Sequence, residues 1–408
     1  MPAESGRTAA AMTGAGEPGA PGWRILVVDD SIVVRAAVRA MLAAMPEVAL
    51  IETARSASAA LAVLVRHAGR APIDVVLLDV EMPSMNGIEA LPHLLRASPS
   101  SRIVMASSLT RKGAAVTMAA LAAGASDYLC KPQAAAVDAR QGFAAELATK
   151  IAIWGADARR SRRPARTPPS ASAATTTGAS DAAARPSGTL SRVVAAERRP
   201  LPESRRGTEL GPIEALAIGS STGGPQALLH LFAALPSPFT CPIFITQHMP
   251  PAFTAMLAEQ IGRLAAGSCR EAEDGEPVAA GRIYVAPGDY HMEILGEAGR
   301  EPQLRLSRSA PENFCRPSVD PMLRSLAPLY RDRLCAVILT GMGHDGAAGA
   351  GLVRRHGGRV IAQDEATSVV WGMPGAVVRA GLADHVLSVP EIAAVLRHRV
   401  CRSFAGAA

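Results

Sequence analysis

Short apolar runs alternate with amphipathic stretches along residues 22–155. The apolar runs, such as RILVV (24–28) and DVVLL (74–78), are strand-like, and each is followed by Ala- and Leu-rich sequence with helical spacing. The other runs are ALIET, RIVMA and DYLC, and we expect helices over 31–45, 57–67, 88–96, 114–123 and near 139–153. This (βα)5 rhythm predicts a parallel sheet covered by helices on both faces, with ligands at the carboxyl ends of the strands.

The same alternation returns in residues 211–400. Strands are expected at IEALAIG, PIFITQ, RIYVAP, LCAVILT and RVIAQ, and helices over 225–234, 253–264, 347–355, near 375–380 and near 390–399. The segments YHMEIL and QLRLSR flank a Gly/Glu turn and predict an antiparallel hairpin. We therefore expect a second α/β domain, doubly wound and mostly parallel, with a β-hairpin.

Two further segments lack periodicity. Residues 156–210 are dominated by Ala, Ser, Thr, Pro and Arg, as in SRRPARTPPSASAATTTGAS. Such a composition cannot bury enough apolar surface to offset the entropy of ordering it, so we interpret the segment as a flexible linker. Residues 1–21 are rich in Ala, Gly and Pro and lack the basic start and apolar block of a signal peptide, which predicts a disordered tail.

Composition and charge exclude several classes of protein. Hydrophobic residues make up 49% of the 408 residues and charged residues 19%, which excludes collagen-like, coiled-coil and wholly disordered chains. The net charge is +6, but residues 157–210 contain eleven Arg against five acids, so the whole surplus lies in the predicted linker. No folded part then carries the basic face that nucleic acid requires, and we expect no nucleic-acid binding.

The apolar runs and the cysteines indicate the cellular compartment. No run of about 18 uncharged apolar residues is present, so we expect no direct membrane insertion. The six Cys show no CxxC spacing, and we interpret them as reduced thiols of a cytoplasmic protein.

Carboxylates follow two of the first set of strands. Asp29 and Asp30 come directly after RILVV, and Asp79 comes directly after DVVLL, so the three should converge at one sheet edge. Oxygen-only ligands in small number suit Mg²⁺. Ser107 and Lys131 end two other strands and would contact an incoming phosphoryl group. Helix N-capping is the alternative for each acid taken singly, but capping explains neither the convergence nor the lysine.

A second set of polar residues lies at strand ends in residues 211–400. The turn GSSTGG (219–224) joins a strand to a helix and suits a nucleophile or an anion site, although a simple tight turn is the alternative. His248 ends PIFITQ, and Asp345 follows LCAVILT within GMGHDG. A serine, a histidine and an acid at one edge are compatible with a nucleophilic triad. Spacing alone leaves other bases and acids open, namely His291, His344, Asp289 and Asp364.

Four motifs in the first part resemble the receiver domain of two-component response regulators across residues 22–135. They are VVDDS, LLDVEMPSMNG, MASSLT and DYLCKP. The resemblance implies that Asp79 is the phosphoacceptor, with a sensor histidine kinase as phosphodonor, and that Mg²⁺ is held by Asp29, Asp30 and Asp79. It also implies that Ser107 and Lys131 contact the phosphoryl group and that Tyr128 is the aromatic of the switch.

Six motifs in the second part resemble the catalytic domain of chemotaxis-specific protein-glutamate methylesterases, from residue 213 to about 398. They are AIGSSTGG, ITQHMPPAF, IYVAPGDYHM, RPSVDPML, VILTGMGHDGAAG and AQDEATSVVWGMP. The resemblance implies nucleophile Ser221, base His248, acid Asp345 and an oxyanion pocket that includes the amide of Met342. Two positions depart from the family pattern: Ser220 precedes the nucleophile and is expected to cap the turn, and His344 precedes Asp345 and is expected at the rim.

The two resemblances together imply one activity. We expect hydrolysis of glutamate methyl esters on methyl-accepting chemotaxis receptors, with release of methanol, and deamidation of receptor glutamines. The ester reaction needs no cofactor, Mg²⁺ serves phosphorylation of the receiver, and we expect a monomer. Two other hypotheses stay open. One is a receiver fused to a noncatalytic output domain, whose signalling output Ser221→Ala would leave unchanged. The other is a nucleotide-binding domain that uses the GSSTGG loop.

Overall fold

The computed structural model describes residues 22–69, 71–108, 110–131, 137–162, 211–296 and 301–401. The predicted tail 1–21 and residues 163–210 of the predicted linker lie outside this part. Within the described residues, no helix combines the length and apolarity that a membrane span requires.

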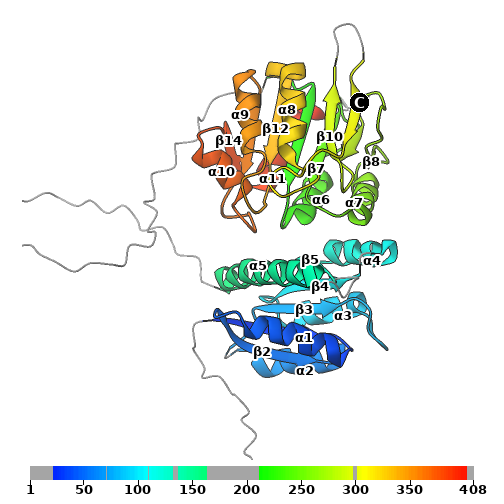
Figure 1. Cartoon of the computed structure of the whole chain (residues 1–408). Helices are drawn as coiled ribbons and strands as arrows, with labels where there is room; N and C mark the ends of the chain where they lie inside the picture. Colours follow the sequence, from blue (N-terminus) through cyan, green and yellow to red (C-terminus); the bar gives the residue numbers. More distant parts are fainter. Residues whose placement is uncertain are drawn as a thin grey trace, which may run out of the picture.

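The first described unit is a five-stranded parallel sheet in the order β2-β1-β3-β4-β5, as predicted (Figure 1). Residues of one strand serve both faces: Leu26 and Val28 join one hydrophobic cluster, whereas Ile25 and Val27 join another. The sheet is therefore buried on both sides. Its elements are β1 Trp23–Val28, α1 Ile32–Ala43, β2 Val48–Ala54, α2 Ala57–His67, β3 Val75–Asp79, α3 Gly87–Ala97, β4 Arg102–Ser107, α4 Arg111–Ala122, β5 Asp127–Cys130 and α5 Val137–Arg162.

Helix α5 continues into the segment expected to be linker. It ends at Arg162, beyond the boundary predicted at residue 155. Arg162 Nη1 lies 2.7 Å from Asp74 Oδ1. Arg102 of β4 forms an ion pair with Asp157 of α5. These ion pairs join residues far apart in the sequence and hold an Arg-rich helix end that periodicity alone does not indicate.

The second unit contains a seven-stranded parallel sheet in the order β14-β13-β12-β6-β7-β9-β8 and a separate β10–β11 hairpin. This confirms the predicted mostly parallel sheet with a hairpin. Its elements are β6 Ala215–Ser220, α6 Gly224–Ala234, β7 Ile243–Gln247, α7 Pro251–Leu264, β8 Cys269–Glu271, β9 Ile283–Val285, β10 His291–Leu295, β11 Gln303–Ser307, α8 Val319–Tyr330, β12 Leu334–Ile338, α9 Ala347–Arg355, β13 Arg359–Gln363, α10 Met373–Arg379, β14 His385–Leu387 and α11 Val389–Val400.

The strand order creates a switch point at the middle of this sheet. Strand β6 lies between β7 and β12, and the chain leaves β6 toward one side and later returns to build the other side from β12. The carboxyl ends of these three neighbouring strands border the crevice where α/β sheets bind ligands. Helix α8, which the sequence pattern did not predict, begins beside this crevice.

The two units meet through helices. Helix α4 packs against α7 and α6, and Figure 1 shows α4 and α5 turned toward the side of the second unit that carries those helices. Hydrogen bonds between described residues cross the contact: Gln226 donates to the carbonyl of Ala125, and Arg160 Nη2 donates to the carbonyl of Ser368 at 3.1 Å.

Candidate functional site

Three carboxylates converge at the carboxyl edge of the first sheet. One oxygen from each of Asp29, Asp30 and Asp79 lies within 4.8 Å of the others. Asp29 and Asp79 are buried, whereas Asp30 is exposed. Lys131 Nζ lies 2.8 Å from Asp29 Oδ2 and 2.8 Å from Asp79 Oδ1. Four of the residues singled out in the sequence are thus in one cluster.

The electrostatics of this cluster favour a cation. Burial raises the pKa of the Asp79 carboxyl, Lys131 opposes that shift, and the charge of Asp29 adds to it. Burial lowers the pKa of the Lys131 ammonium, but its bonds to the two carboxylates outweigh burial and raise it. An all-carboxylate donor set with few ligands fits Mg²⁺, whose charge would favour ionised Asp79.

The two other receiver residues lie on neighbouring strands. Ser107 ends β4, is buried, and donates a hydrogen bond from Oγ to the carbonyl of Ser108 at 3.3 Å. Tyr128 lies on β5, and its ring stacks on Phe253 of α7 with a centroid separation of 4.5 Å. Lys150 Nζ lies 4.9 Å from the centre of the Tyr128 ring. Tyr128 therefore belongs to the contact between the two units.

Ser221 and His248 occupy equivalent positions on neighbouring strands. Ser220 pairs with Gln247 in the β6–β7 ladder, so Ser221 and His248 are each one residue beyond the ladder. The amide of His248 donates to the carbonyl of Ser220 at 3.1 Å. The turn after β12 also approaches closely, since a Cβ at Gly341 would lie 2.8 Å from Ser221 Cβ. Only glycine fits there without displacing the serine.

The largely buried His248 pairs with the buried Asp345. His248 Nε2 lies 2.7 Å from Asp345 Oδ2. Because an ionised carboxylate only accepts, Nε2 carries the hydrogen, and Nδ1 is the nitrogen left to act as a base. Within the described residues, no hydrogen bond joins Ser221 Oγ to this imidazole. The structure thus brings His248 and Asp345 together, and no described residue hydrogen-bonds to the Ser221 hydroxyl.

The N-terminus of α8 stabilises the Asp345 carboxylate. Ser318 Oγ donates to Oδ1 at 2.7 Å, and the amides of Val319 and Asp320 donate to Oδ2 at 2.6 Å and to Oδ1 at 3.1 Å. A helix N-terminus favours a negative charge. Sequence reasoning missed these partners, although the run Ser318-Val-Asp-Pro has the Ser and the early Pro that are typical of a helix start.

The pKa values of the pair move in opposite directions. Burial opposes the charged imidazolium, but the hydrogen bonds with Asp345 and Cys315 outweigh it and raise the pKa of His248 to about 9. Burial likewise opposes the carboxylate, but the bonds from His248 and Val319 hold the pKa of Asp345 well below its usual range. The pair therefore stabilises the imidazolium that proton transfer from a serine would produce.

The competing residues have other environments. His291 is buried; its Nδ1 accepts from the amide of Ser318 at 3.2 Å, and its Nε2 lies 3.1 Å from the carbonyl of Ala310. His344 and Asp289 are exposed, and Asp364 accepts from the amide of Thr367 at 3.1 Å. These hydrogen bonds and exposures give no triad-like pairing.

Ser220 does not cap the turn, contrary to the expectation from the sequence. It is wholly buried, and its Oγ donates to Gln247 Oε1 at 2.7 Å. The N-cap of α6 is Gly223, which has a φ of 77° and no side chain to donate or accept. Ser220 still belongs to β6, and its hydroxyl bonds to the neighbouring strand β7.

Met342 follows Gly341 on the turn beside Ser221. Its side chain is 50% exposed. In the part of the chain that the structure describes, no group accepts a hydrogen bond from its amide. An uncommitted amide on a turn that contacts the serine is what an oxyanion pocket requires.

The fold and the two clusters define a response regulator whose receiver is joined to an α/β output domain of hydrolase type. Residues 25–138 match the family described as response regulator receiver domain, and residues 216–396 match the family described as CheB methylesterase. The chain is 47% identical over 384 residues to the protein-glutamate methylesterase/protein-glutamine glutaminase of group 2 operon from Rhodospirillum centenum, which covers 92% of this chain and 93% of that protein.

Other relatives carry the same description. Protein-glutamate methylesterase/protein-glutamine glutaminase 2 from Caulobacter vibrioides is 43% identical, covering 92% of this chain and 98% of that protein. The crystal structure of the Thermotoga maritima CheB methylesterase catalytic domain is 43% identical, with 46% of this chain and 99% of that chain covered and a TM-score of 0.44. The chain is an enzyme of the protein-glutamate methylesterase/protein-glutamine glutaminase family, which confirms the family expected from the sequence motifs.

Proposed function

We propose that this chain removes methyl groups from glutamate methyl esters of methyl-accepting chemotaxis receptors, and deamidates receptor glutamines, under the control of phosphorylation at Asp79. The observation that carries the catalytic part is the His248–Asp345 pair, 2.7 Å apart, at the strand ends next to Ser221. The names of the relatives include both the ester and the glutamine reactions, which supports this substrate class.

The proposed reaction is an acyl transfer in two halves. Ser221 Oγ attacks the side-chain carbonyl carbon of the ester while His248 Nδ1 takes the hydroxyl proton. The Met342 amide donates to the oxyanion, and His248 returns the proton to the departing methoxide, which leaves as methanol. Water then loses a proton to His248 and attacks the acyl-serine, which frees the glutamate carboxylate and Ser221. A glutamine follows the same course with ammonia as the leaving group.

The proposed phosphorylation uses the carboxylate cluster of the receiver. Asp79 Oδ attacks the phosphorus of a phosphohistidine on a sensor histidine kinase and keeps the phosphoryl group as an acyl phosphate. Asp29, Asp30 and Asp79 would hold Mg²⁺, which supplies neutralisation of the phosphoryl charge. Lys131 and Ser107 would bind the phosphoryl oxygens, since the ammonium already lies 2.8 Å from Asp79.

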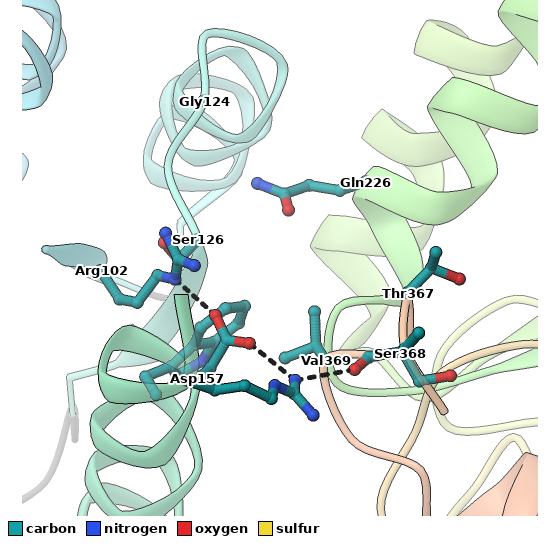
Figure 2. Close-up of a pocket in the computed structure, with 11 residues that line it drawn as sticks. Arg102, Gly124, Ser126, Asp157, Gln226, Thr367, Ser368 and Val369 are labelled. Carbon is teal, nitrogen blue, oxygen red and sulfur yellow. Dashed lines mark hydrogen bonds and ion pairs between the residues drawn. The ribbon is translucent and has the colours of Figure 1, made fainter. Parts of the chain in front are cut away.

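The proposed control acts through the contact between the units. In Figure 2, Asp157 of α5 faces Gln226 of α6 and the residues Thr367, Ser368 and Val369 across a cavity of about 300 Å³. Helices α6 and α7, which the receiver contacts, begin directly after the turns that carry Ser221 and His248. A receiver held there would restrict the approach of a receptor helix, and phosphorylation would favour a receiver state that binds this face less well.

Methanol release from methylated receptor membranes tests the proposed activity. The full-length enzyme should release methanol, and Ser221→Ala should release it at least about a thousandfold more slowly. Ammonia release from receptors with glutamine at the same positions tests deamidation. Undiminished release by Ser221→Ala would exclude this triad.

A further inference from the structure

A tight turn over residues 312–315 lies against the His248–Asp345 pair. Two reciprocal backbone hydrogen bonds close it, from Glu312 to Cys315 at 3.1 Å and back at 2.9 Å. Its two central residues, Asn313 and Phe314, have φ values of 53° and 64°. Left-handed backbone is strained for phenylalanine, and strain of this kind is retained where the surroundings enforce it, often at functional sites.

The first half of the turn is anchored by side chains. Asn313 Nδ2 donates to Asp345 Oδ1 and to Asp320 Oδ2, each at 2.9 Å, so both amide hydrogens are used by acidic side chains at the start of α8 and beside it. Glu312 accepts two hydrogen bonds from Arg324 of α8 at 2.6 and 3.1 Å. The turn is therefore fixed relative to the acid of the pair.

The last residue of the turn contacts the base of the pair. Cys315 Sγ lies 3.3 Å from His248 Nδ1. Since Asp345 occupies Nε2, this thiol is the hydrogen-bond partner of the nitrogen that must accept the serine proton. A thiol is a weak donor and a weak acceptor, so it can donate S–H to a neutral Nδ1 and accept from a protonated one. A weak partner is also readily displaced when Ser221 or a leaving group approaches.

We propose that Cys315 is a positioning residue for the hydrolytic reaction, which holds the His248 ring by its Nδ1 side while Asp345 holds it by Nε2. The inference rests on the proposed triad. Without the thiol, the imidazole keeps one anchor and rotates more freely about it, so fewer encounters with bound substrate have Nδ1 aligned with the serine hydroxyl.

The test compares Cys315→Ala and Cys315→Ser with Cys269→Ala, whose thiol lies on the remote strand β8, in methanol release from methylated receptor membranes. We expect Cys315→Ala to lower kcat about threefold to tenfold, the range of one lost hydrogen bond, with KM unchanged. Cys315→Ser retains a donor and should restore most of kcat, and Cys269→Ala should match the parent. The acid limb of the kcat/KM profile should fall to lower pH in Cys315→Ala, because the thiol contributes to the raised pKa of His248.

Three outcomes would overturn the proposal: an unchanged kcat and acid limb in Cys315→Ala, a raised kcat, or equal losses in the Ala and Ser variants, which would indicate packing alone. If Cys315→Ala does not fold by circular dichroism, Cys315→Val replaces it, since valine fills the volume without a donor. Ser221→Ala in the same assay separates the two claims. An active Ser221→Ala contradicts the triad, whereas an inactive one beside a normal Cys315→Ala contradicts only the role of Cys315.

Discussion

Tyr128 of the receiver stacks on Phe253 of the hydrolase domain, with ring centroids 4.5 Å apart and ring planes 14° from parallel. Phe253 lies in the first turns of α7, shortly after His248 in the sequence. The aromatic that the receiver resemblance implies for the switch is therefore in direct contact with the helix that follows the proposed base. A change in the position of Tyr128 would change the contact between the domains.

This contact predicts the effect of removing the stack. Tyr128→Leu keeps an apolar side chain but loses the ring pairing, which is worth about 0.5–1.5 kcal/mol, so basal methanol release by the unphosphorylated enzyme should rise about twofold to tenfold. Tyr128→Phe retains the stacking and should keep the parental rate. A Tyr128→Leu variant as slow as the parent would argue against control through this contact.

The tandem serines should separate catalysis from stability. Ser221→Ala should lower the rate by at least about a thousandfold, because the nucleophile is lost. Ser220→Ala should retain the chemistry but lose about 1–3 kcal/mol of unfolding free energy, because Gln247 Oε1 would be buried without its donor. Thermal unfolding and methanol release measure the two effects. The reverse assignment would follow if Ser220→Ala were folded and inactive.

The acid of the triad is tested by an isosteric change. Asp345→Asn removes the charge that stabilises the His248 imidazolium, and it should lower kcat by about four orders of magnitude, the loss known for such a change in a Ser-His-Asp triad. The controls Asp289→Asn and Asp364→Asn alter carboxylates that, among the described residues, form no hydrogen bond with the imidazole, and they should be mild. Circular dichroism checks that each variant is folded. Comparable losses in all three would contradict the choice of Asp345.

The pH dependence of activity follows from the raised pKa of His248. Only the neutral imidazole accepts the serine proton, and the imidazolium predominates below the pKa. Since that pKa is about 9, kcat/KM should rise with pH from 7 and level off above the pKa. Asp345→Asn should move this limb to lower pH, because a bond that raises the pKa is lost. A limb at or below the ordinary histidine value of about 6.5 in the parent enzyme would contradict the His248–Asp345 pair as described.

The sequence predicted most of the sheet architecture because strand and helix periods are local. Runs buried on both faces, such as Val75–Asp79, read as continuous apolar segments between turn residues. Parallel order then places Asp29 and Asp79, and likewise His248 and Asp345, at common edges. The order of the strands alone is enough to predict that these residues lie close together.

The parts that the sequence did not reveal depend on long-range contacts. The extension of α5 to Arg162 depends on ion pairs with Asp74, and the bonds that fix Asp345 come from the turn at Asn313 and the start of α8. The expectation that Ser220 caps the turn is wrong because its partner is Gln247 on the next strand. None of these contacts produces a periodic pattern of apolar residues, so the sequence pattern does not reveal them.

The central claim is that phosphorylation of Asp79 controls hydrolysis at Ser221, and one measurement tests it most directly. Methanol release from methylated receptor membranes is followed for the full-length enzyme and for Asp79→Asn, each with and without a small-molecule acyl phosphate and Mg²⁺. Release by the parent should rise severalfold or more with the phosphodonor, whereas Asp79→Asn should stay at the basal rate. An equal rise in Asp79→Asn, or no rise in the parent once its phosphorylation is verified by mass, would contradict the account.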